Sequence, residues 1–97
     1  MNVQVLSIEP TNDDKTFDVV VKIGDTQHKF TMVVKIAPIA NQEIQVTNGD
    51  EHFLETFRFN QMVAFKISKL VSKVYNHQII QLPANISEFM QSPSFVQ

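Results

Sequence analysis

The chain has 97 residues, with eight basic and ten acidic side chains and a net charge of −2. This length predicts one domain over residues 1–97, with a single core that needs neither a disulfide nor a metal. The acidic balance disfavours a dominant role in binding nucleic acid or a membrane surface. Because the chain lacks cysteine, disulfides, thiolate catalysis and cysteine-based zinc sites are excluded.

Neither a membrane segment nor a targeting segment is recognisable in the sequence. No stretch approaches the roughly 18 apolar residues that a membrane span needs. The first residues show no basic segment followed by an apolar run, so we expect no signal peptide. Because the lack of cysteine is more consistent with a reducing compartment, we predict a soluble cytoplasmic protein.

The first predicted element is a strand over residues 1–8. Val3 and Val5 share one face of this strand, whereas Leu6 and Ile8 lie on the other. Either both faces are covered or a β-bulge near Val5 shifts the parity. Turn-forming residues then predict a polar loop before the next strand.

Residues 16–36 predict a β-hairpin, because apolar side chains alternate along two runs. Gly24 and Asp25 separate the runs and suit a type II′ turn, whose first position needs the positive φ that glycine accepts. This two-residue loop fixes the register and predicts three pairs on one face: Phe17 with Met32, Val19 with Phe30, and Val21 with His28. The opposite face carries several charges, so we expect it to be mostly solvated and to discourage edge pairing.

Beyond the hairpin, Pro38 is expected to end the second strand, because proline has no N–H to donate to a sheet. A short strand is predicted over residues 43–47, where Ile44 and Val46 alternate with polar residues.

Residues 52–59 are compatible with two elements. Their aromatic content favours a strand, which would make Asn48-Gly49 a hairpin turn. They also suit the first turns of a helix capped by Asn48 or Asp50. We favour the strand.

The second half of the chain predicts one long helix from an Asn60 cap to about Asn76. Its apolar stripe contains Phe59, Val63, Ile67, Leu70 and Val74. Asn85 could cap a short terminal helix over residues 86–91, and we expect the last few residues to fray. The predicted fold is therefore α+β: an antiparallel β-meander of four to five strands, packed on one face by a single long helix, with a short terminal helix.

Phe65 and three lysines are the strongest functional candidates. Phe65 lies nearly opposite the apolar stripe of the helix, and Lys66, Lys69 and Lys73 form a basic flank beside it. An exposed aromatic side chain among cations is typical of an interaction surface, but single exposed aromatics and solvated lysine flanks are also common. We predict a non-enzymatic interaction module that uses this flank and the segment from Ile79, with a second copy or another protein as partner.

Two other functions remain alternatives. A pocket between the sheet and the helix would use His28, His52, Tyr75 and His77 as its polar groups in a small-ligand binder or an enzyme. A weak anion or nucleic-acid site on the lysine flank is the third alternative. We find no nucleophile motif, no spaced histidine pair and no phosphate-binding glycine loop, so we assign no catalytic residue, metal or cofactor.

Overall fold

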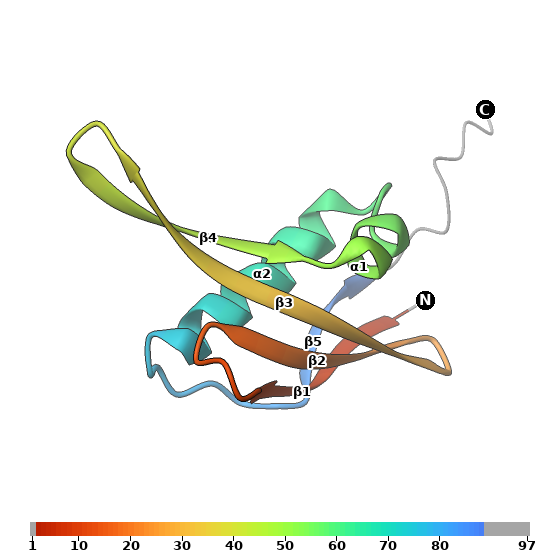
Figure 1. The fold of residues 1–97 in the computed structure, drawn as a ribbon. Coiled ribbons are helices and arrows are strands. Elements are labelled where there is room, and N and C mark those ends of the chain that lie inside the picture. The colour runs from red at the N-terminus through yellow and green to blue at the C-terminus, as the bar shows by residue number, and fades with distance from the viewer. Residues whose placement is uncertain (1, 89–97) are drawn as a thin grey trace.

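Five antiparallel strands form one curled sheet in the computed structural model, which describes residues 2–88 (Figure 1). The strand order across the sheet is β4-β3-β2-β1-β5. The elements are β1 (Asn2–Pro10), β2 (Thr16–Ile23), β3 (Thr26–Ile39), β4 (Gln42–Gly49), α1 (Glu51–Thr56), α2 (Gln61–Tyr75) and β5 (Ala84–Glu88). The predicted α+β fold, a meander covered by one long helix, is confirmed. Neither α1 nor α2 is long and apolar enough to cross a membrane.

The β2–β3 hairpin has the predicted register. Phe17 pairs with Met32, Val19 with Phe30, and Val21 with His28. Of the two turn residues, only Gly24 has a positive φ, at 60°, as a type II′ turn requires. Alternation along both strands and the turn chemistry therefore agree with the structure.

A β-bulge in β1 explains its mixed apolar pattern. The register of β1 against β2 shifts between Val5 and Ser7, and Val3, Val5 and Ile8 are buried. Leu6 is only half-buried. The bulge therefore turns Ile8 to the core face, and of the two alternatives it is the bulge near Val5, rather than cover on both faces, that explains the pattern.

The preferred strand over residues 52–59 is wrong, and the helical alternative is confirmed. The Asp50 carboxylate accepts hydrogen bonds from the Phe53 N–H at 2.9 Å and the Thr31 N–H at 3.0 Å, so it caps α1 and ties it to β3. Helical spacing buries Phe53 and Phe57 together, with ring centroids 4.9 Å apart. The aromatic content of residues 52–59 is therefore as compatible with a packed helix as with a strand.

Asn48-Gly49 is not a hairpin turn. Gly49 ends β4, opposite Met32 of β3. A Cβ atom at this position would overlap the Phe53 ring. The glycine is therefore required by the close approach of α1 rather than by a turn.

Helix α2 matches the prediction closely, and it crosses one face of the sheet (Figure 1). Val63, Ile67 and Val71 are its buried residues, and Leu70 and Val74 are partly buried. Phe59, which we placed on the apolar stripe, precedes the helix and is exposed. Asn60 occupies the N-cap position, but its side chain makes no capping hydrogen bond.

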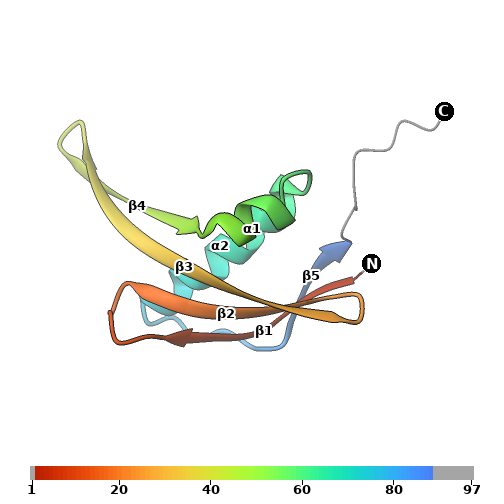
Figure 2. The ribbon, with the colours of Figure 1, turned by 45° about the vertical axis from the view of Figure 1, so that its right-hand side comes forward.

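Pro38 does not end the second hairpin strand, because β3 continues to Ile39 and pairs with β4 throughout its second half. Beyond Val33, β3 has no paired residue on β2. Proline is tolerated in a strand that has a neighbour on one side only. Residues 34–47 therefore form a ribbon, here called the arm, that projects from the body of the sheet (Figure 2). Its tip is a two-residue turn in which Ala40 and Asn41 both have positive φ.

The predicted short terminal helix is wrong where the structure describes it. Ala84–Glu88 is a strand that pairs with β1, and the short helix of the fold is α1. Residues 89–91 of the predicted helix lie outside the described residues. Just before and within β5, partly buried Ile80, Leu82 and Ile86 pack against the core.

Candidate interaction surface

The outer face of α2 combines exposed apolar and basic side chains. Met62 is 68% exposed and Phe65 is 58% exposed, one helical turn apart. Lys66, Lys69 and Lys73 follow on the same side and are all exposed. The Lys69 ammonium lies 5.5 Å from the centroid of the Phe65 ring, within range of a cation–π interaction. Phe65 is therefore exposed, as the helical wheel predicted.

Phe65 also borders a groove between α2 and β4. The groove has a volume of about 330 Å³ and is lined by Gln45, Val46, Thr47, Phe65, Ser68, Lys69 and Ser72. Gln45 spans the two elements at one end. Its amide donates to Asn76 Oδ1 at 2.8 Å, and its carbonyl oxygen accepts from Ser72 Oγ at 3.1 Å and Asn76 Nδ2 at 3.0 Å. This network holds β4 at a fixed distance from α2.

The charge on this helix face is unbalanced. Helix α2 contains no acidic residue. Among residues 2–86, whose side chains the structure describes, an ion pair joins Lys29 and Asp18, and none of the three α2 lysines pairs with a carboxylate. Three cations near an exposed phenyl ring give this surface both an apolar anchor and a positive field.

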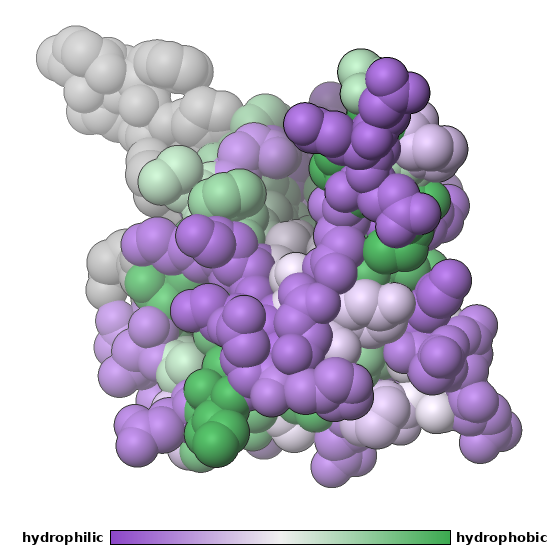
Figure 3. Space-filling view, turned by 90° about the vertical axis from the view of Figure 1, so that its left-hand side faces the viewer, coloured by the Kyte–Doolittle hydropathy of each residue, from purple (hydrophilic) through white to green (hydrophobic). Residues whose placement is uncertain are grey.

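Seen from the side of the arm tip, the surface shows hydrophobic patches separated by hydrophilic side chains rather than one continuous area (Figure 3). Ile79, part of the predicted C-terminal surface, is 97% exposed, but the residues after it pack on the core or pair in β5. The C-terminal segment therefore contributes mainly to the fold within the described residues.

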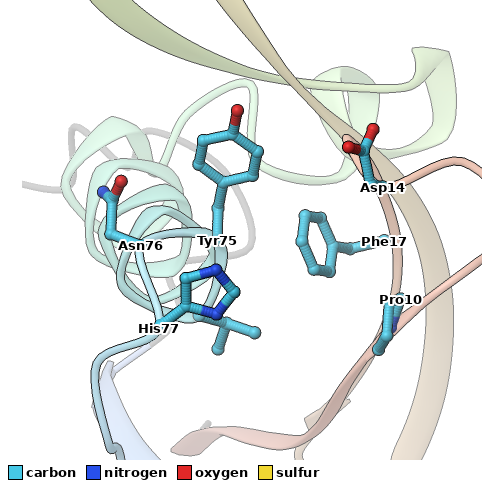
Figure 4. A pocket seen from close by; sticks show the side chains of 7 residues that line it. Pro10, Asp14, Phe17, Tyr75, Asn76 and His77 are labelled. Atoms are coloured by element: carbon cyan, nitrogen blue, oxygen red, sulfur yellow. The ribbon is translucent and has the colours of Figure 1, made fainter.

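A second and larger pocket lies at the C-terminal end of α2. It has a volume of about 670 Å³ and is lined by Pro10, Asp14, Phe17, Val74, Tyr75, Asn76 and His77. The Tyr75 and His77 rings stand at the helix end on one side of the pocket, and Phe17 and Asp14 lie across from them (Figure 4). The pocket is thus walled by aromatic rings and rimmed by polar groups.

The backbone at this helix end explains where His77 lies. The His77 N–H donates to the Val74 carbonyl at 3.0 Å, and the Gln78 N–H donates to the Lys73 carbonyl at 2.9 Å. These two bonds form a Schellman motif, which needs a left-handed residue at the first position after the cap. His77 occupies this position with φ of 62°, where glycine is usual. The chain therefore holds a histidine in a costly conformation beside the pocket.

His28 and His52 meet elsewhere, on an aromatic cluster between β3 and α1. Their ring centroids are 5.6 Å apart, and His28 stacks parallel to Phe30 at 5.9 Å. Burial lowers the pKa of His28 below its usual 6.5, and the neighbouring His52 lowers it further. The sequence did not show that these two histidines meet, because the β3–α1 contact depends on a helix that we predicted as a strand.

The four residues of the alternative pocket therefore separate into two pairs. His28 and His52 lie near the β2–β3 turn, whereas Tyr75 and His77 line the pocket beside the start of β2. No group of three histidine, aspartate or glutamate side chains within residues 2–88 is placed to hold a metal ion together. The structure supports a pocket at Tyr75 and His77 but does not combine all four polar groups in one site.

No protein family matches this sequence, and no curated protein is similar enough to it to indicate a relative.

Proposed function

We propose that this protein is an interaction module that binds an acidic, partly apolar segment of another protein along the α2–β4 groove. The observation that supports it most directly is Phe65, a phenyl ring more than half exposed at the rim of a groove and covered on one side by the Lys69 ammonium. Binding, rather than catalysis, is the proposed activity. Its proposed setting is the cytoplasm, which the lack of cysteine favours.

The chemistry of the partner follows from the surface. An aromatic side chain at the edge of a depression is a typical anchor for binding energy, provided that a partner covers it and excludes water. Lys66, Lys69 and Lys73 have no carboxylate partners among residues 2–86, so an approaching acidic segment gains charge complementarity without breaking a pair within this range. An apolar side chain flanked by Asp or Glu satisfies both requirements.

The size of the groove favours a peptide segment over a metabolite. Its volume of about 330 Å³ lies at the lower end of the range for small-molecule pockets. Gln45, Ser72 and Asn76 close one end with exposed hydrogen bonds. A chain that lies along the groove can place one or two side chains between β4 and Phe65 and remain solvated elsewhere.

Selection from a library of short random peptides tests this function. The wild-type protein should enrich peptides that carry an aromatic or aliphatic residue beside Asp or Glu, and Phe65→Ser should not. Leu54→Ser, which removes an exposed apolar residue from α1, is the matched control and should select the same peptides as wild type. Binding should weaken as salt rises, because exposed charges are screened.

Two results would contradict the proposal. One is enrichment that is unchanged in Phe65→Ser and Lys69→Ala. The other is preferential binding of a single-stranded RNA probe with steep salt dependence, which would favour the nucleic-acid alternative. In that case the lysines, rather than Phe65, would be the principal contacts.

Small-ligand binding at the Tyr75 pocket is a second candidate, supported by the strained His77 backbone. Aromatic walls with a carboxylate at the rim suit an organic cation. Benzyltrimethylammonium is a suitable probe: its titration should shift the NMR signals of Phe17 and Tyr75 in wild type. Tyr75→Ala should remove this response, and a wild type that shows no shifts would exclude this ligand class.

A further inference from the structure

The two edges of the sheet differ in how well they resist pairing with another strand. The β5 edge is short, shifts register against β1 and follows Pro83 directly. The β4 edge has eight residues in unbroken register with β3, contains no proline and carries one charge, Glu43. Short length, irregularity, proline and lysine are the usual devices that protect an edge strand, and β4 lacks all of them.

The charged strands that we expected to discourage edge pairing are β2, which lies inside the sheet, and β3, which does so as far as Val33. The edge itself presents Ile44 and Val46, which are 40% and 39% exposed. The charges of β2 and β3 therefore do not protect the β4 edge from pairing with another strand.

The hydrogen-bond pattern shows which backbone groups of β4 face outward. Val34 donates its N–H to the Lys15 carbonyl, on the side of β3 away from β4. Its pair with Thr47 is therefore a non-hydrogen-bonded pair, in which the Thr47 N–H and C=O point away from β3. By alternation the same holds for Gln45 and Glu43. Within the part of the chain that the structure describes, the N–H and C=O groups of these three residues form an unpaired row along the edge.

We propose that β4 pairs with β4 of a second copy of this chain, antiparallel and about a two-fold axis at Gln45. In this register Gln45 lies opposite Gln45 of the second copy, and Glu43 lies opposite Thr47 of the second copy. The outward-facing N–H and C=O groups of the two strands therefore hydrogen-bond to each other. The same register brings Ile44 opposite Val46 in a non-hydrogen-bonded pair, where side chains approach most closely. It also keeps the two Glu43 carboxylates apart.

The sequence of β4 favours a second copy of the chain as the strand that pairs with this edge, because Ile44 and Val46 lie symmetrically about Gln45. Shifting the register by two residues in one direction puts Ile44 opposite Asn48, and in the other it shortens the overlap. The axis at Gln45 is therefore the arrangement that pairs both apolar residues over most of the strand. It joins two five-stranded sheets into one and leaves α2 of both copies on the same face.

This inference does not rest on the proposed peptide groove. Gln45, Val46 and Thr47 of β4 also line the groove, but edge pairing uses the outward backbone groups of this strand. The apolar anchor and the cation of the groove, Phe65 and Lys69, lie on α2 and take no part in it. Phe65→Ser should therefore leave self-association unchanged, so the two proposals can fail separately.

Solution mass over a wide concentration range is the first test. Because edge pairing buries a modest area, we expect a reversible equilibrium between 11.1 kDa chains and a species of twice this mass. Ile44→Lys should shift the midpoint of this equilibrium at least tenfold toward higher concentration. Leu54→Lys, the same change at an exposed residue of α1, should not shift it. Circular dichroism checks that both variants are folded.

Single-cysteine variants test the register, because the natural chain has no thiol. In Gln45→Cys the two thiols sit on directly opposed residues, with Cα atoms about 5.5 Å apart, a separation that a disulfide spans. In Glu43→Cys they are offset by four residues, about 13 Å. Mild oxidation should therefore cross-link Gln45→Cys and not Glu43→Cys.

Three results would overturn the proposal. These are a constant mass of 11.1 kDa at every concentration, self-association unaffected by Ile44→Lys, and cross-linking of Glu43→Cys at the rate of Gln45→Cys.

Discussion

The two halves of β3 have the same sequence pattern and very different surroundings. Residues 26–33 pair with β2, and Phe30 and Met32 are fully buried beneath the helices. Residues 34–39 pair only with β4; Val34 is still buried at the start of this segment, but Ile36 and Ile39 are exposed. Apolar alternation therefore predicts that both halves are strands, but burial depends on whether another layer covers them.

This difference in burial suggests that the first half of β3 serves the stability of the domain and the second half serves interaction. The first half belongs to the core that holds the domain together, with the rings of Phe53 and Phe57 within 5.5 Å of Phe30. The second half belongs to the arm, whose apolar residues beyond the buried Val34 are largely exposed and add little to the folded monomer. In a protein that keeps exposed apolar residues on a regular edge strand, association is the natural explanation for them.

The largest expected effect is loss of core packing at Phe30. Phe30→Ala should lower the free energy of unfolding by about 3–5 kcal/mol, because it leaves a cavity among fully buried rings. Ile39→Ala in the arm should cost no more than about 0.5 kcal/mol. Urea unfolding below the association concentration measures both, and equal losses would mean that the arm is as buried as the core.

The next effect concerns the junction between the two regions. Asp50 ties α1 to β3 through two hydrogen bonds close to where β4 ends. Asp50→Ala should cost about 1–2 kcal/mol through loss of the helix cap. Asp50→Asn keeps an acceptor oxygen and should recover part of this loss. If Asp50→Ala has wild-type thermal stability, the cap does not hold α1 against the sheet.

A smaller gain in stability is expected at the tip of the arm. Ala40 adopts φ of 50°, a left-handed conformation that costs a non-glycine residue roughly 1 kcal/mol. Ala40→Gly relieves this strain and should raise stability by up to about 1 kcal/mol, offset in part by greater freedom of the unfolded chain. Ala37→Gly, inside the arm strand, should lower stability instead. A loss at both positions would show that the turn is not left-handed.

The smallest effect is a pH dependence from His28 in the core half. Because its pKa is lowered in the folded state, the folded protein binds a proton less readily than the unfolded chain. The contribution of His28 to stability is therefore complete above pH 6.5 and falls as the pH drops below that value toward the lowered pKa. Unfolding measured from pH 7.5 to 5 should show a shallower slope in His28→Gln than in wild type. Identical slopes would contradict the assignment.

The parts of the fold that depend on neighbouring residues in the sequence were predicted correctly from the sequence. The β2–β3 register followed from one glycine turn and two alternating runs, and α2 followed from its apolar stripe. The segment with Phe53 and Phe57 failed because the pattern of its aromatic residues suits both a helix and a strand. Pro38 was misjudged because its cost depends on whether a neighbour lies on its N–H side, which the sequence does not show.

The candidate sites were predictable to a smaller degree. The helical wheel correctly exposed Phe65, but the groove beside it requires the position of β4. His28 contacts His52, and Tyr75 shares a pocket with Phe17, but each of these pairs joins elements distant in the sequence. The open β4 edge had a sequence signal, a nearly uncharged strand, but only the strand order shows that this strand is terminal.

Amide hydrogen exchange along β4, at low and high protein concentration, tests most directly whether the arm is an association surface. At low concentration the N–H groups of Glu43, Gln45 and Thr47 should exchange fast, and those of Ile44 and Val46 should be protected by β3. At high concentration the first three should slow, most at Gln45, and the pattern should revert in Ile44→Lys. Fast exchange at Gln45 at every concentration would contradict edge pairing.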